Sequence, residues 1–430
     1  MAMREIQTEL AIIGSGPAGL AAASVAIEAN RTVCLVDNQA QPGGQIWRGG
    51  LQSDSRAHAA MQSLAHSDGV RLAQHTLVAA LAPSHRAHAL LLEGPAGPVC
   101  IHADRVILAN GARERHLPFP GWTLPGVTGA GGLQALVKGG WPIQGQRVVV
   151  AGSGPLLLAS ARTVQQAGGQ VTHILEQASQ ASLRRFTLQL PNWPGKAWQA
   201  LLLGSQFLGR YRADSHVVAA HGTSKLEAIE IKSGNQTKTI ACDHLAIGYG
   251  LIPNTDAAQL LGCELTGEAV KVDSNLRTTC PGVYAAGEVT GIGGVDKAWV
   301  EGHMAACAAL ALPVSQVKLQ HWKSHHRFSQ LLAECFALNP ALMALAKPDT
   351  LICRCEDVSL QALAGFEDWR EAKLQTRCGM GACQGRTCGA ICQQVLGWAS
   401  PGLRPPVFPA KLATLAALAD RPQPETEGIS

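Results

Sequence analysis

The chain has 430 residues, 47% of them hydrophobic and 15% charged, with a formal net charge of +4 at pH 7. This composition excludes a largely disordered chain and suits about two to four globular domains. The small net charge comes without a dense run of lysine and arginine, so we expect no nucleic-acid partner.

The beginning of the chain does not resemble a targeting signal. Residues 1–9 carry charge, and the apolar stretch after them is interrupted at Gly14, too early for a signal-peptide core with its cleavage site. No uninterrupted run of about 18 apolar residues occurs, so we expect no membrane span. The sequence predicts a cytoplasmic protein, either free or peripherally attached at the inner membrane.

A glycine-rich turn follows the first buried-strand pattern, Leu10–Ile13, and leads into an apolar helix to about Ala29. In such a fingerprint the first glycine permits the tight turn, the second lets a pyrophosphate approach the backbone, and the third lets helix and strand pack closely. The next strand, 32–36, ends at Asp37, where an acid would bind a ribose hydroxyl. The predicted dinucleotide-binding turn consists of Gly14, Ser15, Gly16, Pro17, Ala18 and Gly19.

Three further segments extend this first site. Glycines after the acid let the chain pass close to a ligand. The segment 105–112 is predicted as a buried strand that runs into Asn110-Gly111-Ala112, and the segment 282–288 as a strand that ends in a glycine and an acid. A helical stretch of about 295–311 follows the second of them. The additional site residues are Gly43, Gly44, Gln45, Asn110, Gly111, Gly287 and Glu288.

Across about residues 7–310, these motifs resemble the two-dinucleotide-domain flavoproteins that include thioredoxin and glutathione reductases. The resemblance implies FAD in the first site and gives Gly287 and Glu288 the contact to its ribityl chain. The family usually has Asp at Glu288 and Thr at Asn110. Both replacements keep a hydrogen-bonding side chain.

The same unit recurs in the middle of the chain, with a strand at 146–151, a glycine turn, a helix to about Ala167 and a strand that ends in an acid. Related reductases hold NAD(P)H in this domain. Leu157 stands at the third glycine position, where we expect its side chain to hold the helix away from the strand and reshape the pocket. We therefore expect either a second adenine nucleotide, ATP or NAD, or a domain that has lost NADH turnover. The second-site residues are Gly152, Ser153, Gly154, Pro155 and Glu176.

Six of the 13 cysteines lie between Cys353 and Cys392, while the other seven are scattered and interpreted as core residues. No Cys-x-x-Cys occurs, which excludes the flavin-adjacent dithiol of thioredoxin reductases. Clustered thiolates are ligands for zinc or iron-sulfur clusters, and the close Cys353-x-Cys355 spacing favours iron-sulfur. The segment resembles the domain named after bacterioferritin-associated ferredoxin. That resemblance implies a 2Fe-2S cluster on Cys353, Cys355, Cys383 and Cys388, and leaves Cys378 and Cys392 as packing residues.

The combination resembles the larger subunit of bacterial amine and amino-acid dehydrogenases, a family that includes opine oxidases, hydrogen cyanide synthase, and D-hydroxyproline and proline dehydrogenases. The resemblance implies an electron-transfer subunit whose partner is a D-amino-acid-oxidase-like FAD subunit. Further expectations are a quinone acceptor and a small ferredoxin-like subunit. A stand-alone NAD(P)H-dependent FAD oxidoreductase is the alternative. No residue stands out as a catalytic acid or base, so none is assigned.

The expected fold class is α/β, with two Rossmann-like domains in three layers and a small helical C-terminal domain. The FAD-binding domain is discontinuous and covers 1–115 and 246–312, and the second nucleotide-binding domain is inserted at 116–245. A helical linker, 313–350, leads to the cluster domain, 351–400. A Pro-rich segment and tail, 401–430, follows, and its end is expected to be disordered.

Overall fold

The computed structural model describes residues 3–48, 54–81, 86–399 and 402–419. They form two compact units. Unit 1 comprises Met1–Arg113, Ile252–Ser329 and Gly402–Ser430, and unit 2 comprises Glu114–Leu251 and Gln330–Pro401. The tail after Ala419 lies outside the described residues. None of the described helices is long and apolar enough to cross a membrane.

Unit 1 contains a seven-stranded sheet in the order β3-β2-β1-β6-β5-β4, with β19 also paired to β6. β1, β2, β3, β6 and β19 run parallel, whereas β4 and β5 form an antiparallel extension beside β6. The strands are β1 (Arg4–Ile13), β2 (Val33–Asp37), β3 (Val70–Ala73), β4 (Thr76–Leu81), β5 (His88–Gly94), β6 (Gly97–Leu108) and β19 (Val283–Ala285).

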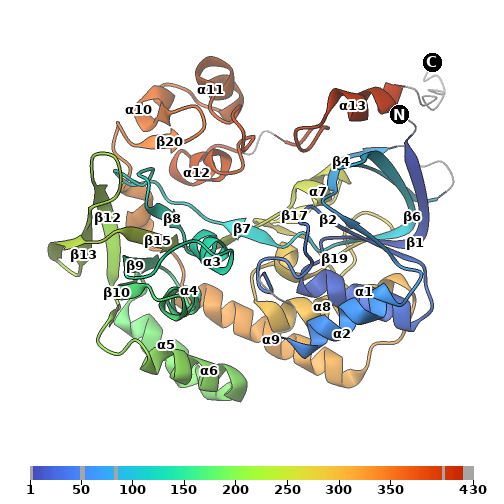
Figure 1. Cartoon of the computed structure of the whole chain (residues 1–430), viewed down its shortest axis with the longest axis horizontal. Coiled ribbons are helices and arrows are strands. Elements are labelled where there is room, and N and C mark those ends of the chain that lie inside the picture. The colour runs from blue at the N-terminus through green and yellow to red at the C-terminus, as the bar shows by residue number, and fades with distance from the viewer. Residues whose placement is uncertain (1–2, 49–53, 82–85, 400–401, 420–430) are drawn as a thin grey trace. The chain divides into compact units, whose positions relative to one another are not determined.

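Apolar residues cover both faces of this sheet. On β1, Leu10 and Ile12 pack into one core and Ala11 and Ile13 into another, because successive side chains of a strand point to opposite faces. Three helices lie together on one face (Figure 1). They are α1 (Pro17–Glu28), α2 (Ser55–Ala65) and α8 (Val295–Ala309). The remaining elements are α7 (Asp256–Leu260), β17 (Leu265–Thr266), β18 (Ala269–Val270), η3 (Gly287–Thr290) and α13 (Leu412–Ala419).

Unit 2 repeats the parallel design with a five-stranded sheet in the order β11-β10-β9-β15-β8. Its strands are β8 (Val127–Gly129), β9 (Arg147–Gly152), β10 (Gln170–Glu176), β11 (Tyr211–Arg212) and β15 (His244–Gly248). A three-stranded antiparallel sheet consists of β12 (Ser215–His221), β13 (Ala228–Ser233) and β14 (Gln236–Ala241). The helices are α3 (Ala130–Lys138), α4 (Leu156–Gln166), α5 (Gln180–Gln189), η2 (Leu190–Asn192) and α6 (Pro194–Ser205). The expected α/β class with two Rossmann-like domains is confirmed.

The cysteine-rich module shares a hydrophobic core with the unit 2 sheet. Ile352 and Trp398 of the module belong to the same buried cluster as Val149 and Tyr249 of the nucleotide-binding part. The elements of the module are η4 (Pro340–Ala344), β20 (Leu351–Cys353), β21 (Val358–Ser359), α10 (Leu360–Leu363), α11 (Trp369–Thr376) and α12 (Cys388–Val395). It is therefore packed as part of unit 2 and not as a separate appendage.

Boundaries between the units fall within β7 (Ala112–Glu114), within β16 (Leu251–Pro253) and within α9 (Gln316–Cys335). The helical sequence of about 316–346 is not one helix, because α9 ends at Cys335 and a short non-helical segment, Phe336–Asn339, precedes η4. Pro340 explains the break in part, since a proline disfavours helical geometry in the residue before it. Asn339 accordingly has extended dihedral angles.

Candidate nucleotide and metal sites

The first glycine turn has the shape that close approach of a phosphate requires. Gly14 has φ +112°, and a Cβ at this position would stand 2.2 Å from the Ala109 oxygen. A Cβ on Gly19 would stand 1.8 Å from the Gly14 oxygen, which explains why helix α1 can start directly on the turn. At Gly16, by contrast, no described residue lies within 4 Å of the Cβ position, so the described part of the chain leaves the space above the turn open.

The other sequence-predicted residues of unit 1 gather around this turn. The Gly43 N–H donates to the Ser15 oxygen at 2.8 Å, and a Cβ on Gly44 would stand 3.1 Å from Gly16 Cα. Asp37 lies at the end of β2 and accepts hydrogen bonds from the Ser15 backbone N–H and hydroxyl, at 2.7 and 2.5 Å. Gln45 follows the glycine pair in the same loop.

Asn110 and Gly111 offer a second indication that a ligand fits here. The Asn110 Oδ1 is buried and has no hydrogen-bond partner among the described residues, an arrangement that is costly unless something else satisfies the oxygen. Gly111 has φ +67° and nothing within 4 Å of its Cβ position. An unsatisfied acceptor and two open glycines fit a polar, phosphate-containing cofactor.

Gly287 and Glu288 lie beside the start of α1, since a Cβ on Gly287 would stand 3.0 Å from Ala18 Cβ. The Glu288 carboxylate accepts hydrogen bonds from the backbone N–H groups of Gly293 and Gly294, at 3.1 and 2.6 Å. Burial raises the pKa of Glu288, opposed by the Gly294 N–H and the charge of Lys297. Glu288 thus shapes the loop before α8, in addition to the ribityl contact that the sequence led us to expect.

Sequence reasoning missed a buried ion pair that supports this turn. Glu301 Oε2 accepts from the Gly287 N–H at 2.9 Å and from the Thr290 hydroxyl at 2.8 Å. Lys297 Nζ donates to the same carboxylate oxygen and to the Gly287 oxygen. The signal available in the sequence was a lysine and a glutamate four residues apart in an alanine-rich helix.

The second glycine turn is built on the same plan. Gly152 has φ +152°, and a Cβ there would stand 2.1 Å from the Gly248 oxygen. Pro155 precedes α4. Leu157 is completely buried, and its Cδ2 would stand 3.2 Å from a Cβ on Gly248. The bulk at the third glycine position is thus accommodated by a glycine on the neighbouring strand β15.

Glu176 ends β10 with no exposed surface. Its Oε2 accepts from the Gly154 N–H at 2.7 Å and from the Tyr211 hydroxyl at 3.3 Å, and its Oε1 accepts from the Ala178 N–H at 2.8 Å. Burial raises the pKa of Glu176, while the backbone hydrogen bonds oppose that shift.

The structure brings the clustered cysteines of the module together. The sulfurs of Cys353, Cys378 and Cys388 lie within 4.8 Å of one another, and all three residues are buried. Cys388 lies beside both Cys378 and Cys353, and Cys378 also lies beside Cys392. Two of the four sequence-predicted ligands therefore lie together with Cys378, which the sequence analysis interpreted as a packing residue.

The other two predicted ligands form a second pair, because the thiols of Cys355 and Cys383 lie close enough for each to affect the pKa of the other. Gly381 permits this approach, since a Cβ on it would stand 2.2 Å from Cys355 Cβ. Burial opposes ionisation of Cys383, but N–H groups of Thr387 and Gly385 outweigh it and lower the pKa of this thiol. A lowered pKa favours the thiolate that a metal binds.

Trp residues connect the module to the rest of unit 2. The Trp122 Nε1 donates to the Leu351 oxygen at 2.7 Å, and the Arg354 guanidinium lies 5.3 Å from the Trp122 ring centre. Gly379 and Gly385 pack against Trp369, where a Cβ on Gly379 would stand 2.5 Å from the ring. Trp122 from outside the module and Trp369 from within it thus both help to position the cysteine loops.

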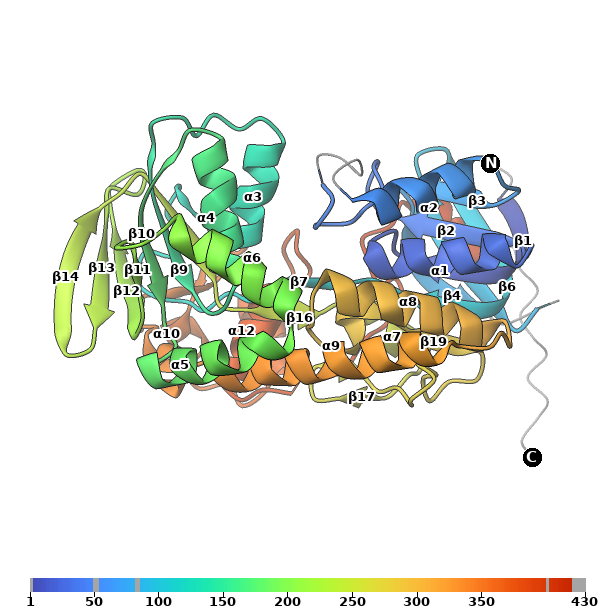
Figure 2. The ribbon, with the colours of Figure 1, turned by 90° about the horizontal axis from the view of Figure 1, so that it is seen from below.

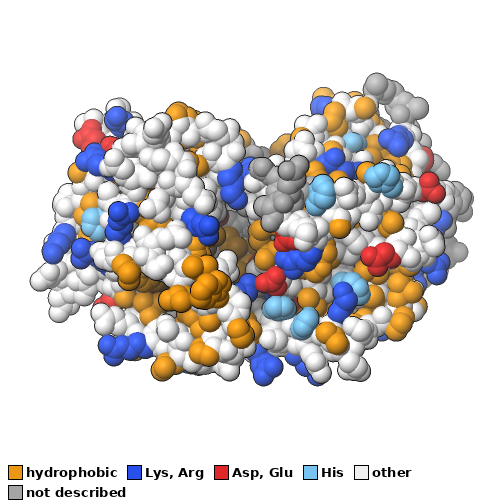
Figure 3. All heavy atoms as spheres, turned by 60° about the horizontal axis from the view of Figure 1, so that its bottom comes forward, with side chains coloured by type: hydrophobic (Ala, Val, Ile, Leu, Met, Phe, Trp, Pro, Cys, Tyr) orange, Lys and Arg blue, Asp and Glu red, His pale blue; other side chains and the backbone are white. Residues whose placement is uncertain are grey.

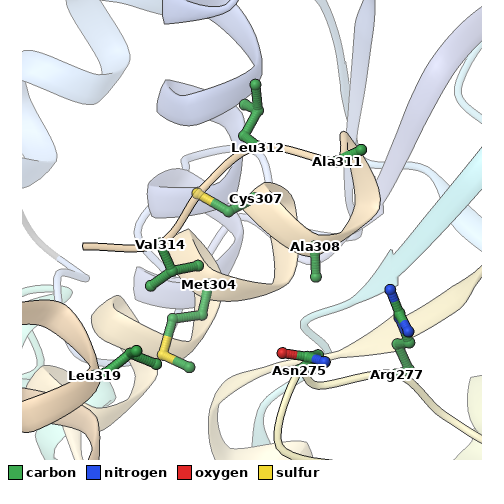
Figure 4. Close-up of a pocket in the computed structure, with 9 residues that line it drawn as sticks. All are labelled: Asn275, Arg277, Met304, Cys307, Ala308, Ala311, Leu312, Val314 and Leu319. Atoms are coloured by element: carbon green, nitrogen blue, oxygen red, sulfur yellow. The ribbon is translucent and has the colours of Figure 1, made fainter. Parts of the chain in front are cut away.

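A pocket of about 280 Å³ lies elsewhere in unit 1, at the C-terminal part of α8 (Figure 4). Met304 and Cys307 lie on its helical side, while Asn275 and Arg277 come from the loop before β19. It contains none of the sequence-predicted site residues, so we do not assign it to either cofactor.

An apolar surface covers α5, α6 and the residues that follow in unit 2 (Figure 3). Its members are large hydrophobic side chains with 44% to 82% exposure: Leu188, Trp198, Leu201, Leu202 and Leu208. We call it the α5–α6 surface. Contiguous apolar surface of this kind is typical of sites that bind another protein.

Comparison with known proteins agrees with the geometry of both units. The family described as pyridine nucleotide-disulphide oxidoreductase matches residues 8–309. A subunit of opine oxidase from Agrobacterium tumefaciens (strain Ach5) is 31% identical, over 95% of this chain and 92% of that protein. The HcnB subunit of hydrogen cyanide synthase from Pseudomonas protegens is 30% identical, over 93% of this chain and 94% of that protein.

Solved structures with the same fold include L-proline dehydrogenase from P. horikoshii, with a TM-score of 0.68 and 18% identity, over 96% of this chain and 80% of that one. Thioredoxin reductase from T. acidophilum has a TM-score of 0.55 and 20% identity, over 71% of this chain and 98% of that one. At this level of identity, the likeness establishes the fold.

Proposed function

Because the chain belongs to the pyridine nucleotide-disulphide oxidoreductase family, we propose that it is the electron-transfer subunit of a multi-subunit dehydrogenase. The family and the relatives support FAD as the cofactor of unit 1. In unit 2, we propose a 2Fe-2S cluster. The assembly would oxidise an amino acid, imino acid or opine, such as D-hydroxyproline or proline, on a D-amino-acid-oxidase-like partner subunit, with a quinone as acceptor.

The arrangement of the cysteines carries this proposal. A 2Fe-2S cluster needs four thiolates, two for each iron. Cys353 with Cys388, and Cys355 with Cys383, are two such pairs within one loop region. Two separate segments of unit 2 supply these thiols: the end of β20 with the turn after it, and the loop before α12 with the first residue of that helix. Such a juxtaposition of thiols is typical of a metal site.

The residues of unit 1 fit the role proposed for FAD. Gly16 and Gly111 leave open space, and the Asn110 oxygen needs a donor. When bound, FAD and the cluster would supply the redox chemistry, and the protein would position them and set their potentials. The Gly287 turn, held by Glu301 and Lys297, provides that positioning beside α1.

Two observations support partner subunits. Relatives that match nearly the whole chain are named as subunits, of opine oxidase and of hydrogen cyanide synthase. The α5–α6 surface also exposes five large apolar side chains, and exposed apolar patches often bind another protein. We propose that the partner flavoprotein covers this surface.

The test is metal and flavin analysis of the chain purified anaerobically with its partner. We expect about one FAD, two irons and two acid-labile sulfides per chain. We also expect flavin reduction by an amino-acid substrate only when the partner is present. Zinc in place of iron, or reduction by the substrate without any partner, would overturn the proposal.

The alternative, a stand-alone NAD(P)H-dependent FAD oxidoreductase, requires an accessible second nucleotide site. Anaerobic addition of NADH to the purified chain distinguishes the two. Rapid bleaching of the flavin would favour the alternative, and an unchanged spectrum would favour the electron-transfer role.

A further inference from the structure

The second glycine turn is covered by a segment of the same chain. A Cβ on Gly154 would stand 3.7 Å from Cγ of Phe336, so an aromatic ring lies directly over this glycine. At the equivalent Gly16 of unit 1, none of the residues that the structure describes lies within 4 Å of the Cβ position. The second glycine of the fingerprint lacks a side chain so that a pyrophosphate can approach it. In unit 2, a phenylalanine ring fills that space.

Polar groups of the turn hold the backbone of the covering segment, Phe336–Asn339. The Ser153 hydroxyl donates to the Phe336 oxygen at 2.9 Å. Gln177 donates from Nε2 to the Ala337 oxygen at 3.0 Å and accepts from the Asn339 N–H at Oε1, also at 3.0 Å. Gln177 directly follows Glu176, so its amide binds the peptide at the strand end where a ribose would otherwise lie.

Contacts with α5 anchor the segment from the other side. The Phe336 ring packs edge-on against Phe186, with ring centres 5.0 Å apart. Arg185 of α5 also forms an ion pair with Glu334 in the last turn of α9. Figure 2 shows α5 alongside this end of α9. The ion pair is exposed and contributes little, so the aromatic pair and the three hydrogen bonds dominate.

The acid of the second site has no accessible oxygen left. Both Glu176 oxygens accept hydrogen bonds from unit 2, and the residue has no exposed surface. A ribose could bind only by displacing the Gly154 N–H or the Tyr211 hydroxyl from this buried carboxylate. Breaking such a buried network without a replacement is costly.

We propose that Phe336–Asn339 is a specificity-determining segment that occupies the phosphate-binding turn of unit 2 and excludes NADH, NADPH and free adenine nucleotides. The exclusion stands on this geometry alone, and only its consequence, that electrons arrive from a protein partner, rests on the proposed function. The segment runs directly into η4 and the cysteine module. The same segment therefore both covers the glycine turn and connects α9 to the cysteine module.

Isothermal titration of the FAD-loaded full-length chain with ADP, ATP and NADH tests the exclusion. We expect no saturable binding by the wild type with a Kd below about 1 mM. The variant Phe336→Ala/Gln177→Ala removes the ring and two of the three hydrogen bonds, and we expect it to bind ADP at least about tenfold more tightly. Leu374→Ala, at a 65% exposed position of α11 outside the covering segment, is the control and should not change nucleotide binding.

Two results would overturn the inference: tight binding of any of these nucleotides by the wild type, or a double variant with native circular dichroism and flavin content that gains no affinity. The wild-type titration decides even if the double variant does not fold. A chain that lacks iron but excludes nucleotides would sink the proposed function and leave this inference standing.

Discussion

Lys297 Nζ lies 2.9 Å from Glu301 Oε2, and the two side chains are only 4% and 3% exposed. Both residues also bind the Gly287 turn, whose N–H donates to Glu301 and whose oxygen accepts from Lys297. A buried pair is weak evidence of net stabilisation, but removal of one residue leaves an uncompensated charge. The turn beside α1 should therefore depend on both residues together.

Lys297→Met should lower the free energy of unfolding by about 3–5 kcal/mol, because it leaves Glu301 buried without its cation. Urea denaturation followed by circular dichroism measures the loss, and flavin content should fall with it. The double variant Lys297→Met/Glu301→Gln removes both charges and should recover much of the stability. A single variant as stable as the wild type would contradict the structural role of the pair.

Gly16→Val should weaken FAD binding by at least about tenfold while leaving the fold intact. Gly16 has φ −73°, which valine tolerates, and its Cβ position meets nothing within 4 Å, so the new side chain would occupy only the phosphate space. Flavin content and fluorescence of released FAD provide the measurement. Gly195→Val, at another open glycine, is the control and should retain full flavin.

Cys355→Ala and Cys383→Ala should each reduce iron and acid-labile sulfide to a small fraction of the wild-type content, because each removes one of four thiolate ligands. Cys392→Ala should retain the wild-type iron content, since Cys392 lies beside Cys378 and is outside the proposed ligand set. Retention of iron by Cys383→Ala together with its loss from Cys392→Ala would contradict the proposed ligand set.

Trp198→Glu with Leu201→Glu should abolish copurification of the partner flavoprotein while flavin and iron contents stay unchanged. The two side chains are each 62% exposed on the α5–α6 surface, so charge there disfavours burial against a partner more than it affects the fold. Leu374→Glu, at a 65% exposed position of α11, controls for added charge. Size-exclusion chromatography of the complex is the measurement. An intact complex with the double variant would show that the partner binds a different surface.

His303 should make the chain less stable as the pH falls from about 6.5 to about 4. Burial, with help from the charge of Lys318, lowers the pKa of His303 from 6.5 to about 4. Between these values the unfolded chain binds more protons than the folded one, so stability is lost as the pH falls. The difference in thermal midpoint between pH 7 and pH 5 should be smaller for His303→Gln. Equal differences would show that His303 is not the responsible group.

The nucleotide-binding turns could be predicted from the sequence because they depend on residues that are close together in the chain. Gly14, Gly16 and Gly19 follow a strand and open a helix, and a Cβ on Gly14 or Gly19 would collide with a backbone oxygen. The residues that contact these turns from distant parts of the chain could not be predicted. Glu301 lies 14 residues from Gly287, and Gln177 lies 160 residues from Ala337, so neither contact has a local pattern.

The sequence by itself determined the two Rossmann-like units and the thiol-rich module, because turns, strand periodicity and cysteine spacing are encoded over short stretches. Only the tertiary structure decided what fills each glycine turn. Gly16 and Gly154 occupy the same place in the same motif, yet one faces open space and the other faces Phe336. The physical reason is that access to a site depends on chain segments that are distant in the sequence and pack against it in the fold. The residues of the motif do not indicate which segments these are.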